Sequence, residues 1–393
     1  MKRIAVALIF ALLAIMADAT PRVFIVNIYP GEQIYQLEGH TALVVADSTA
    51  VTAYNYGVFD FDSPNFVWRF VKGETDYMLA AYPFGYLEME YRREGRRAVA
   101  HEIEMDSVQT QRLLHALQEN LQPQNRVYRY NYVKDNCATR PLDIIEKALG
   151  DSIALAPAPF EAQPLLKPTF RNVMRMCHSN YPWYQFGIDI ALGSGIDQPV
   201  TRREMAFAPV ELDGMLGGAT VAGRPLVKYT TVMNDVPAHA AILPATPWYL
   251  TPMFVCWAFM GLCVVVTAVG VRHHRRFRGF DAVFFGILGL TGCLLTFLIF
   301  VSVHEATSPN YLYIWLNPLC LVVPALTWIP RAAEVLRWYY IVYSAALVLM
   351  IGCWYWLPQS ANPAFVPLIA ATLMRSMAGA AGTQQKRPRS VNT

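Results

Sequence analysis

Charged residues are scarce in this sequence. Of its 393 residues, 16% are Asp, Glu, Lys or Arg, against roughly 25% in soluble domains, while 54% are hydrophobic and 13% aromatic. This composition excludes a disordered chain, a collagen-like repeat and a small disulfide scaffold. The formal net charge of +3, without a basic stripe interleaved with aromatic residues, gives no case for a nucleic-acid partner. Because apolar residues concentrate in the last third, we expect a membrane protein with a water-soluble front part.

Cysteine is scarce outside the apolar runs. Only Cys137 and Cys177 lie there, and no Cys-x-x-Cys pair or zinc-type Cys/His spacing is present. We therefore expect neither a metal nor an organic cofactor. In one interpretation the two cysteines form a disulfide in an oxidising compartment, and in the other Cys137 has a chemical role. The remaining cysteines are expected to be small apolar fillers: Cys256, Cys263, Cys293, Cys320 and Cys353.

The amino terminus indicates export. Lys2 and Arg3 precede an apolar run over residues 4–17, and the tripeptide Ala-Asp-Ala ends at residue 19. This pattern is typical of a cleavable secretory signal, which we place at residues 1–19. An uncleaved anchor is the alternative, although the run is shorter than the about 20 apolar residues of a spanning helix. Either interpretation exports the segment that follows.

The last third of the sequence contains apolar runs that predict membrane crossings. The loop over residues 272–278 is dense in Arg and His, whereas the loops over 304–310 and 358–363 contain no Lys or Arg. The positive-inside rule places the basic loops in the cytoplasm, and five crossings then leave the amino-terminal part outside, as the signal also requires. The runs cover residues 248–271, 281–303, 311–329, 338–357 and 364–378.

We therefore expect an exported domain over residues 20–247, a transmembrane domain over 248–378 and a cytoplasmic tail over 379–393. Alternating β-rich runs and helical patterns predict an α+β fold for the exported domain. Its aromatic stretch at 64–73 stays unassigned, and the Pro- and Ala-rich segment 151–168 is predicted to be a linker or lid. The predicted strands cover 23–29, 39–47, 51–57 and 97–105, with 127–133 extended; the predicted helices cover 106–121 and the residues from Cys137 to Gly150.

One cysteine lies in a sequence suited to nucleophilic chemistry. Cys137 belongs to Asp-Asn-Cys-Ala-Thr-Arg at residues 135–140, where a polar turn enters a predicted helix. A thiolate there faces unpaired backbone N–H groups and the positive end of the helix dipole, which together lower a thiol pKa. Pro141 is suited to a first helical turn, so a helix that starts nearer Thr139 is the alternative, and it weakens the dipole effect.

A catalytic cysteine needs a base and a third group that orients the base. His40, which follows Gly39 at the start of a predicted strand, is the candidate base. The candidate orienting or oxyanion groups are Asn55, Tyr56 and Asn136, with Asp47 as a further orienter. The competing histidines are His101, His178 and His115, the last of which is interpreted as structural because it lies mid-helix among leucines.

Several motifs together resemble one protein family. They are Gly-His-Thr-Ala-Leu at 39–43, Tyr-Asn-Tyr-Gly-Val-Phe-Asp-Phe at 54–61, the motif around Cys137, Thr-Phe-Arg at 169–171, and Asn310 with Trp-Leu-Asn-Pro at 315–318. This set resembles the Lnb-type lipoprotein N-acyltransferases over nearly all of the mature chain. The order of histidine before cysteine is also similar to that of circularly permuted NlpC/P60-like thiol enzymes, including the lecithin–retinol acyltransferase group.

The resemblance implies a papain-like, permuted NlpC/P60-like α+β periplasmic domain, followed by an all-α membrane domain of about five transmembrane helices in the inner membrane. It implies a cysteine-dependent acyltransferase in which His40 is the base and Cys137 the nucleophile. Surrounded by membrane lipids, the enzyme would take its acyl chain from a phospholipid and transfer it to the α-amine of a diacylglyceryl-cysteine lipoprotein. The third catalytic group is not identified by the resemblance.

Candidate substrate-binding residues lie in both parts of the chain: Arg140, Arg171, His304 and Asn310. The last two, at the outer end of the second apolar run, bind a lipid headgroup, dock the exported domain or are ordinary interfacial residues. Five aromatic residues form a further cluster in the sequence: Phe59, Phe61, Phe66, Trp68 and Phe70. Three interpretations are open: they line an acyl pocket, enter the membrane interface or pack in the core.

Two other functions stay open at this point. A membrane-tethered cell-wall amidase or peptidase would use the same cysteine and histidine on glycan-linked peptides. A non-enzymatic envelope scaffold or sensor would instead pair Cys137 with Cys177.

Overall fold

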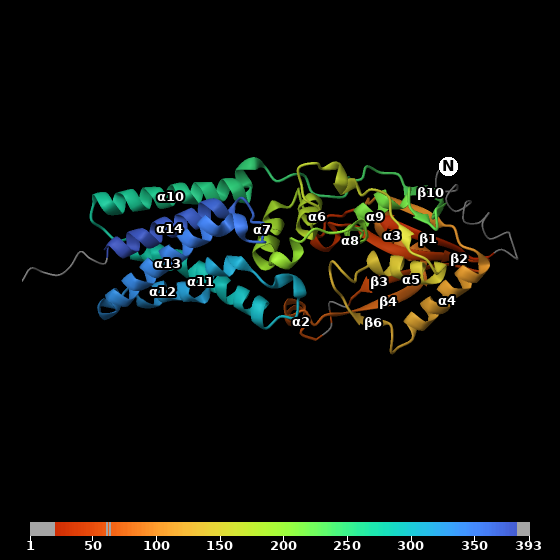
Figure 1. Ribbon diagram of the computed structural model, residues 1–393, viewed down its shortest axis with the longest axis horizontal. Coiled ribbons are helices and arrows are strands. Elements are labelled where there is room, and N and C mark those ends of the chain that lie inside the picture. The colour runs from red at the N-terminus through yellow and green to blue at the C-terminus, as the bar shows by residue number, and fades with distance from the viewer. Residues whose placement is uncertain (1–19, 60–61, 63, 383–393) are drawn as a thin grey trace, which may run out of the picture. The chain divides into compact units, whose positions relative to one another are not determined.

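The computed structural model describes residues 20–59, 62 and 64–382, and it separates into two compact units (Figure 1). The first consists of the chain up to Asn180 together with Pro199–Pro244, and the second of Tyr181–Gln198 together with the chain from Ala245 onward. The sequence predicts a single boundary between residues 247 and 248. The two units differ from that expectation because Tyr181–Gln198 belongs to the second unit. The predicted signal at 1–19 and the tail from residue 383 lie outside the described residues.

The first unit is built on a seven-stranded sheet in the order β10-β5-β1-β2-β3-β4-β6. Every pairing in this order is antiparallel. The three strands β5, β1 and β2 are buried on both faces along nearly their whole length, as their apolar composition requires. The strands are β1 (Arg22–Ile28), β2 (His40–Ala46), β3 (Val51–Val58), β4 (Asp76–Pro83), β5 (Ala98–Ile103), β6 (Val127–Arg129) and β10 (Val227–Asn234).

Helices pack against this sheet. Phe84, Leu87 and Tyr91 of α3 join the even-numbered residues of β1 and β2 in one core cluster. Odd-numbered residues of the same strands, such as Ile25 and Leu43, are buried on the opposite face, as the two-residue period of a strand requires. The helices are α2 (Phe66–Lys72), α3 (Phe84–Arg93), α4 (Ser107–Leu121), α5 (Thr139–Leu149), α6 (Phe170–Cys177), α8 (Arg202–Met205) and α9 (Pro209–Leu216); β7 (Ile153–Ala154), β8 (Thr220–Val221) and β9 (Arg224–Pro225) form a small second sheet.

The sequence predicted most of the elements that surround the site. β1, β2, β3 and β5 lie where the β-rich runs predict them, and β2 pairs with β3 as the predicted hairpin. α4 begins after Asp106, whose side chain accepts a hydrogen bond from the Gln109 N–H, and α5 ends at Gly150, whose φ is 77°. The sequence missed β4, α3 and β10, and the unassigned aromatic stretch forms α2. The predicted linker or lid at 151–168 contains β7 and the buried Phe160, so part of it is packed.

The second unit is helical. Among the described residues, three of its helices are long and apolar enough to cross a membrane: α10 (Pro252–Arg272), α11 (Arg278–Phe300) and Pro330–Trp356, which contains α13 (Ala333–Cys353). Two apolar helices are shorter: Tyr311–Leu326, which contains α12 (Val322–Leu326), and Phe365–Ala381 of α14 (Phe365–Gly382). Each predicted apolar run therefore contains a helix, while the count of five crossings stays a prediction.

Glycines let parts of the second unit, called the membrane unit below, approach each other closely. A Cβ atom at Gly292 of α11 would lie 2.2 Å from the backbone of Asn317, and one at Gly289 would lie 2.6 Å from Leu321. Helices in lipid gain stability from this close packing, because an apolar side chain gains little by leaving lipid for protein. The two glycines therefore form the surface on which the segment before α12 packs.

A buried ion pair joins three helices of the same unit. Arg375 of α14 donates to both carboxylate oxygens of Asp281 on α11, at 2.8 and 2.9 Å, and to the Thr267 hydroxyl of α10 at 2.8 Å. Charges in apolar surroundings persist when they are paired and hydrogen-bonded. Loss of either partner would leave an uncompensated buried charge.

Tyr181–Gln198, which contains α7 (Pro182–Ala191), is fastened to the membrane unit by polar contacts. The Asn310 side chain donates to the Ile190 carbonyl at 2.8 Å, and the Gly193 N–H donates to the Ala306 carbonyl at 2.8 Å. A Cβ atom at Gly193 would lie 2.3 Å from a backbone oxygen, so only glycine fits there. This segment, which precedes the apolar runs by some distance in the sequence, is thus part of the membrane unit.

Replacing Gly292 with Val should destabilise the membrane unit, because the new side chain would overlap the Asn317 backbone. We expect a lower melting temperature in detergent and less full-length protein in membrane fractions. Gly261→Val is the matched control on α10, since nothing lies within 4 Å of its Cβ position. Equal effects of the two substitutions would contradict the packing argument.

Candidate functional site

The Asn136 side chain orders the turn that contains Cys137 and leads into α5. The Asn136 Oδ1 accepts hydrogen bonds from the N–H groups of Ala138 and Thr139 at 2.9 and 3.0 Å. Its backbone carbonyl accepts from the Arg140 N–H at 3.2 Å. α5 itself begins at Thr139, and its N-terminal flanking residue Ala138 has no side-chain cap. Cys137 therefore lies in the turn before the helix, as the alternative of a start nearer Thr139 predicted, and this position weakens the dipole effect on the thiol.

The Cys137 thiol is 7% exposed, and this burial raises its pKa. The backbone N–H of Thr41 and the hydroxyl of Tyr130 face the sulfur, and their hydrogen bonds to a thiolate lower the pKa. The nearby carboxylate of Glu38 raises it. Because burial is the largest of these effects, the resting sulfur at neutral pH is a thiol that must give its proton to a base before it reacts.

The candidate base His40 directly precedes Thr41, whose N–H faces the sulfur. Its Nε2 lies 2.7 Å from the Asn55 Oδ1 on β3, and the Asn55 amide nitrogen donates to the Tyr82 hydroxyl at 2.7 Å. With the Nε2–H donating to Asn55, Nδ1 is the nitrogen left to accept a proton. Burial, followed by the charge of Arg96, lowers the pKa of His40 to about 4. The ring is therefore neutral at neutral pH.

Two glycines in left-handed conformations shape the strands around this site. Gly39 has a φ of 89°, and a Cβ atom there would lie 2.6 Å from a backbone oxygen of β1. Gly57 has a φ of 87°, and a Cβ atom there would lie 3.2 Å from the Tyr130 ring and 3.6 Å from the Cys137 Cβ. Glycine adopts this conformation without strain, which explains its place in both motifs.

In the described structure no hydrogen bond joins the His40 ring to the Cys137 sulfur, as is common before substrate binds.

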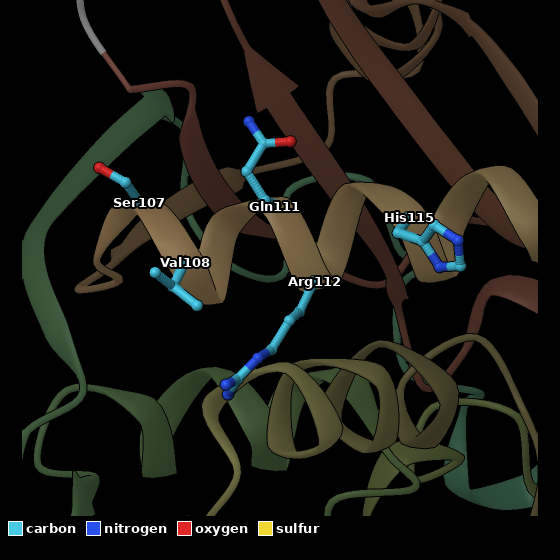
Figure 2. Close-up of a pocket in the computed structure, with 5 residues that line it drawn as sticks. All are labelled: Ser107, Val108, Gln111, Arg112 and His115. Carbon is cyan, nitrogen blue, oxygen red and sulfur yellow. The ribbon is translucent and has the colours of Figure 1, made fainter.

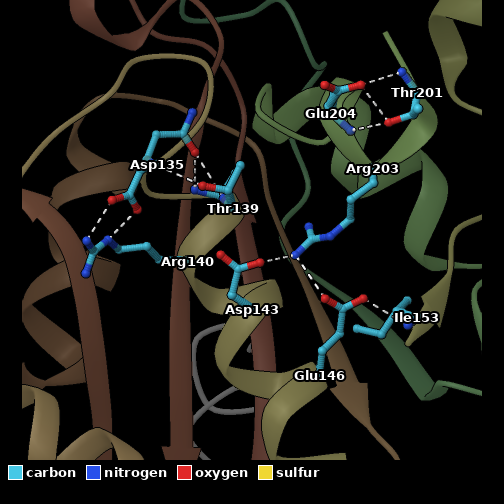
Figure 3. A network of polar contacts seen from close by, with 11 residues as sticks. Asp135, Thr139, Arg140, Asp143, Glu146, Ile153, Thr201, Arg203 and Glu204 are labelled. Atoms are coloured by element: carbon cyan, nitrogen blue, oxygen red, sulfur yellow. Dashed lines mark hydrogen bonds and ion pairs between the residues drawn. The ribbon is translucent and has the colours of Figure 1, made fainter. Parts of the chain in front are cut away.

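Ion pairs hold α5, the helix that follows Cys137 (Figure 3). Arg203 donates to Asp143 at 2.5 Å and to Glu146 at 3.2 Å, and both acceptors are on α5. The Glu146 carboxylate also accepts from the Ile153 N–H at 2.9 Å. These contacts tie α5 to the chain on either side of it and so help to fix the Cys137 backbone.

Of the four candidate orienting or oxyanion groups, Asn55 is the one in contact with His40. Asp47 accepts hydrogen bonds from Thr49 and Ala50 in the turn after β2. The Tyr56 hydroxyl accepts a hydrogen bond from Asn120 at 2.9 Å. The Asn136 amide nitrogen donates to two backbone carbonyls at 2.9 and 2.8 Å. Tyr56 and Asn136 thus stabilise the fold around the site, and Asn136 does so in the turn before α5.

The predicted substrate-binding arginines are engaged within the first unit. Arg140 donates to both Asp135 oxygens at 2.5 and 2.7 Å, and its guanidinium lies 3.4 Å from the centre of the Tyr128 ring. Arg171 is fully buried in the first turn of α6. Both arginines are therefore buried or paired within the first unit, and their binding of substrate stays a prediction.

The predicted substrate-binding residues of the membrane unit differ from each other. His304 is exposed. Asn310 is buried, and besides its bond to Ile190 its Oδ1 accepts from the Leu312 N–H at 3.1 Å and from Gln359 at 3.1 Å. The Asn310 amide therefore holds loops of the membrane unit together.

The other histidines of the first unit have different surroundings from His40. His101 and His178 are buried against carboxylates, with Nε2 2.8 Å from Asp213 and 2.5 Å from Glu38, respectively. His115 is exposed on α4 rather than packed among the neighbouring leucines. There it lines a shallow hollow that contains neither Cys137 nor His40 (Figure 2), together with Ser107, Val108, Gln111 and Arg112.

Cys137 and Cys177 are both free thiols, so the disulfide alternative is not formed in this structure. Burial raises the pKa of Cys177 well above the usual thiol value, which makes it unreactive at neutral pH. In the described part of the chain, no group of three or more His, Cys, Asp or Glu side chains is placed to hold a metal ion.

Sequence reasoning missed two tyrosines of the site. Tyr82 lies on β4, which was not predicted, and fixes the Asn55 amide. Tyr130 follows the short β6 and faces the Cys137 sulfur. The alternation of tyrosines at 128, 130 and 132 was the one signal in the sequence that could have pointed to it.

These features define a membrane protein whose α+β domain carries a thiol site and whose remaining part consists of apolar helices. Residues 14–173 match the family model of the Lnb N-terminal periplasmic domain, and residues 244–387 match that of the Lnb transmembrane domain. The chain therefore belongs to the Lnb-type family, and membership indicates a membrane protein that modifies lipoproteins. The comparisons with curated proteins and with solved structures give no match.

The raised pKa of the Cys137 thiol predicts slow alkylation at neutral pH. We expect the rate of its modification by iodoacetamide, followed by mass spectrometry of the Cys137 peptide, to level off at a higher pH than that of an ordinary thiol, because burial raises the pKa of this thiol and the thiolate is the reactive form. A small free thiol under the same conditions is the control. An inflection below neutral pH would show a preformed thiolate and contradict this description of the site.

Proposed function

We propose that this protein is a multi-pass inner-membrane acyltransferase. It transfers an acyl chain from a phospholipid, through a thioester on Cys137, to the α-amine of a diacylglyceryl-cysteine lipoprotein. The observation that supports this most is the set of donors that face the sulfur, the Thr41 N–H and the Tyr130 hydroxyl, in the turn before α5. His40, which directly precedes Thr41 in the chain, is held by Asn55.

The first step forms the thioester. The His40 Nδ1 takes the thiol proton as the sulfur attacks the ester carbonyl carbon of the phospholipid. The S–C bond forms, the ester C–O bond breaks, and His40 passes the proton to the leaving oxygen of the lysophospholipid. The raised pKa of Cys137 and the lowered pKa of His40 favour a neutral pair at rest, so the proton moves as attack begins.

The second step transfers the acyl chain to nitrogen. The uncharged α-amine attacks the thioester carbon, the C–N bond forms and the C–S bond breaks. His40 takes a proton from the amine and returns it to the sulfur, which regenerates the enzyme. Exclusion of water from the thioester favours attack by the amine over hydrolysis, and the burial of Cys137 supports this condition.

Negative charge develops on the carbonyl oxygen in both steps. That oxygen is bonded to the carbon that the sulfur attacks, so donors that face the sulfur are within reach of it. We therefore assign the Thr41 N–H and the Tyr130 hydroxyl to the oxyanion. We do not assign the Asn136 amide, because two backbone carbonyls already occupy it.

Both substrates are anchored in a bilayer, which explains the combination of a thiol site with apolar helices. Anchoring the enzyme in the same membrane raises the effective concentration of both substrates at the site. A cell-wall amidase acts on a polymer outside the membrane and has no corresponding use for the helices. The apolar helices therefore favour acyl transfer between lipids over peptide hydrolysis.

The proposal includes the finer architecture that the sequence predicts. His40 on a strand, followed by Cys137 in the turn before α5, supports a papain-like, permuted NlpC/P60-like fold for the periplasmic domain at 20–247. The five apolar helices support five crossings over 248–378, with the basic loop at 272–278 in the cytoplasm and the domain that carries Cys137 in the periplasm.

Replacing Cys137 with Ser should abolish transfer of a labelled acyl chain from phospholipid to a diacylated lipoprotein peptide while leaving the protein folded. Cys177→Ser is the matched control and should retain activity, because that thiol has no role in the reaction. Folding is checked by the melting temperature of each variant in the same detergent.

Two outcomes would overturn this function. Full transfer activity in the Cys137→Ser variant would remove the nucleophile from the mechanism. Release of peptide fragments from purified peptidoglycan by the wild type, but not by this variant, would assign the same thiol to a cell-wall amidase.

Replacing Asn55 with Ala should slow the reaction by less than the roughly 10²–10⁴-fold loss expected when the base itself is removed. The Asn55 hydrogen bond raises the pKa of His40, so its loss should also shift the acidic limb of the pH–rate profile below about pH 4. Asn120→Ala, which removes the partner of Tyr56, is the control and should leave that limb in place. An unchanged limb in the Asn55 variant would contradict the assigned orienting role.

A further inference from the structure

Aromatic rings form a continuous line from the surface of α2 to the reactive sulfur within the first unit. Successive ring centres are 6.0 Å apart between Phe70 and Phe66, and 5.8 Å apart between Phe66 and Phe59. The next steps are 5.0 Å from Phe59 to Tyr77 and 4.2 Å from Tyr77 to Tyr130, whose hydroxyl faces the Cys137 sulfur. These steps together are comparable with the extended length of a long fatty chain.

We propose that this aromatic line is the binding surface for the acyl chain of the donor phospholipid. The ester carbonyl would lie at the Tyr130 end, next to the sulfur, and the methyl end of the chain would lie against α2. The inference rests on the proposed function, because it takes a carbonyl group held at Cys137 as its fixed point. It decides between the interpretations that the sequence left open for the aromatic stretch.

The aromatic line is accessible rather than enclosed in the core. At the α2 end, Trp68 is 57% exposed and Phe70 is 50% exposed. Phe59, Tyr77 and Tyr130 are partly buried. An apolar surface that begins at the exterior and ends at a reactive thiol is suited to a ligand that is apolar along its length and reactive at one end. A fatty acyl ester has this form.

The charges beside the aromatic line favour a hydrocarbon ligand over a phosphate group. Asp76 pairs with Arg69 at 2.7 Å and with Arg129 at 3.4 Å, and Glu74 pairs with Lys72 at 2.5 Å. Each of these basic side chains already has an acidic partner, which leaves little attraction for a phospholipid headgroup. We therefore expect the aromatic line to select the length of the chain rather than the chemistry of the headgroup.

Single-turnover acylation of Cys137 in the full-length protein in detergent micelles tests this proposal. The two donors are dihexanoyl- and dipalmitoyl-phosphatidylethanolamine, whose short and long chains cover different lengths of the aromatic line. Phe59→Ala and Phe66→Ala should slow acylation by the long-chain donor about tenfold, because they remove apolar contacts with the distal chain. The rate with the short-chain donor should change by less than about twofold, since its chain ends before these rings.

Tyr86→Ala is the matched control, because it removes a 62% exposed ring on α3 that is outside the aromatic line. This variant should leave both rates unchanged. Equal losses with the two donors, no loss with either, or the same loss in the control would overturn the assignment while leaving the proposed function intact. If neither donor acylates Cys137 in the wild type, the proposed function itself fails.

A photo-crosslinking measurement tests the direction of the chain independently of rate. In the Cys137→Ala variant, a phosphatidylethanolamine with a diazirine at the end of its acyl chain should label peptides within residues 59–72. A diazirine next to the carbonyl should instead label the peptide that contains Tyr130. The same distribution of label from both probes would contradict an extended chain along the aromatic line.

Discussion

The hydrogen bonds of Asn136 in the turn before α5 are the interactions on which the candidate site depends. One buried amide, that of Asn136, accepts from two helix N–H groups and donates to two backbone carbonyls. A buried amide group that lacks a hydrogen-bond partner destabilises the folded state. The four hydrogen bonds of Asn136 therefore favour the one conformation of the turn in which all of them form. Cys137 follows immediately, and its sulfur is thereby held toward the Thr41 N–H and the Tyr130 hydroxyl. Arg203, which pairs with two acidic residues of α5, supports the same placement.

This arrangement holds the reactive groups without ionising them. Burial raises the pKa of the Cys137 thiol and lowers that of His40, so neither group carries charge at neutral pH. A neutral pair suits the proposed reaction with an uncharged ester donor, because no solvated ion has to be stripped of water before attack. The Asn55 amide keeps one nitrogen of His40 protonated and the other free to accept the proton.

Patterns local in sequence predicted the main parts of the fold, and they also supplied Cys137 and His40 as candidates, whose catalytic roles stay a proposal. The hairpin of β2 and β3, the cap of α4 and the Gly150 end of α5 follow from residues within one element. The contacts that complete the site cannot be predicted from one element. They form because strand pairing brings β4 and the segment with Tyr130 to the site from distant parts of the sequence. For the same reason the sequence did not predict that Asn310 would bind the distant Tyr181–Gln198 segment. Residue type alone assigned Arg140 and Asn310 to substrate, whereas the folded chain already satisfies their hydrogen bonds.

The most direct test of the central claim is mass spectrometry of the wild-type protein after incubation with a phospholipid of defined chains and no acceptor. The account predicts an added mass equal to one acyl group on the Cys137 peptide, removed by hydroxylamine as a thioester is. An unmodified Cys137 peptide alongside release of lysophospholipid, or an acyl group on another residue, would contradict it.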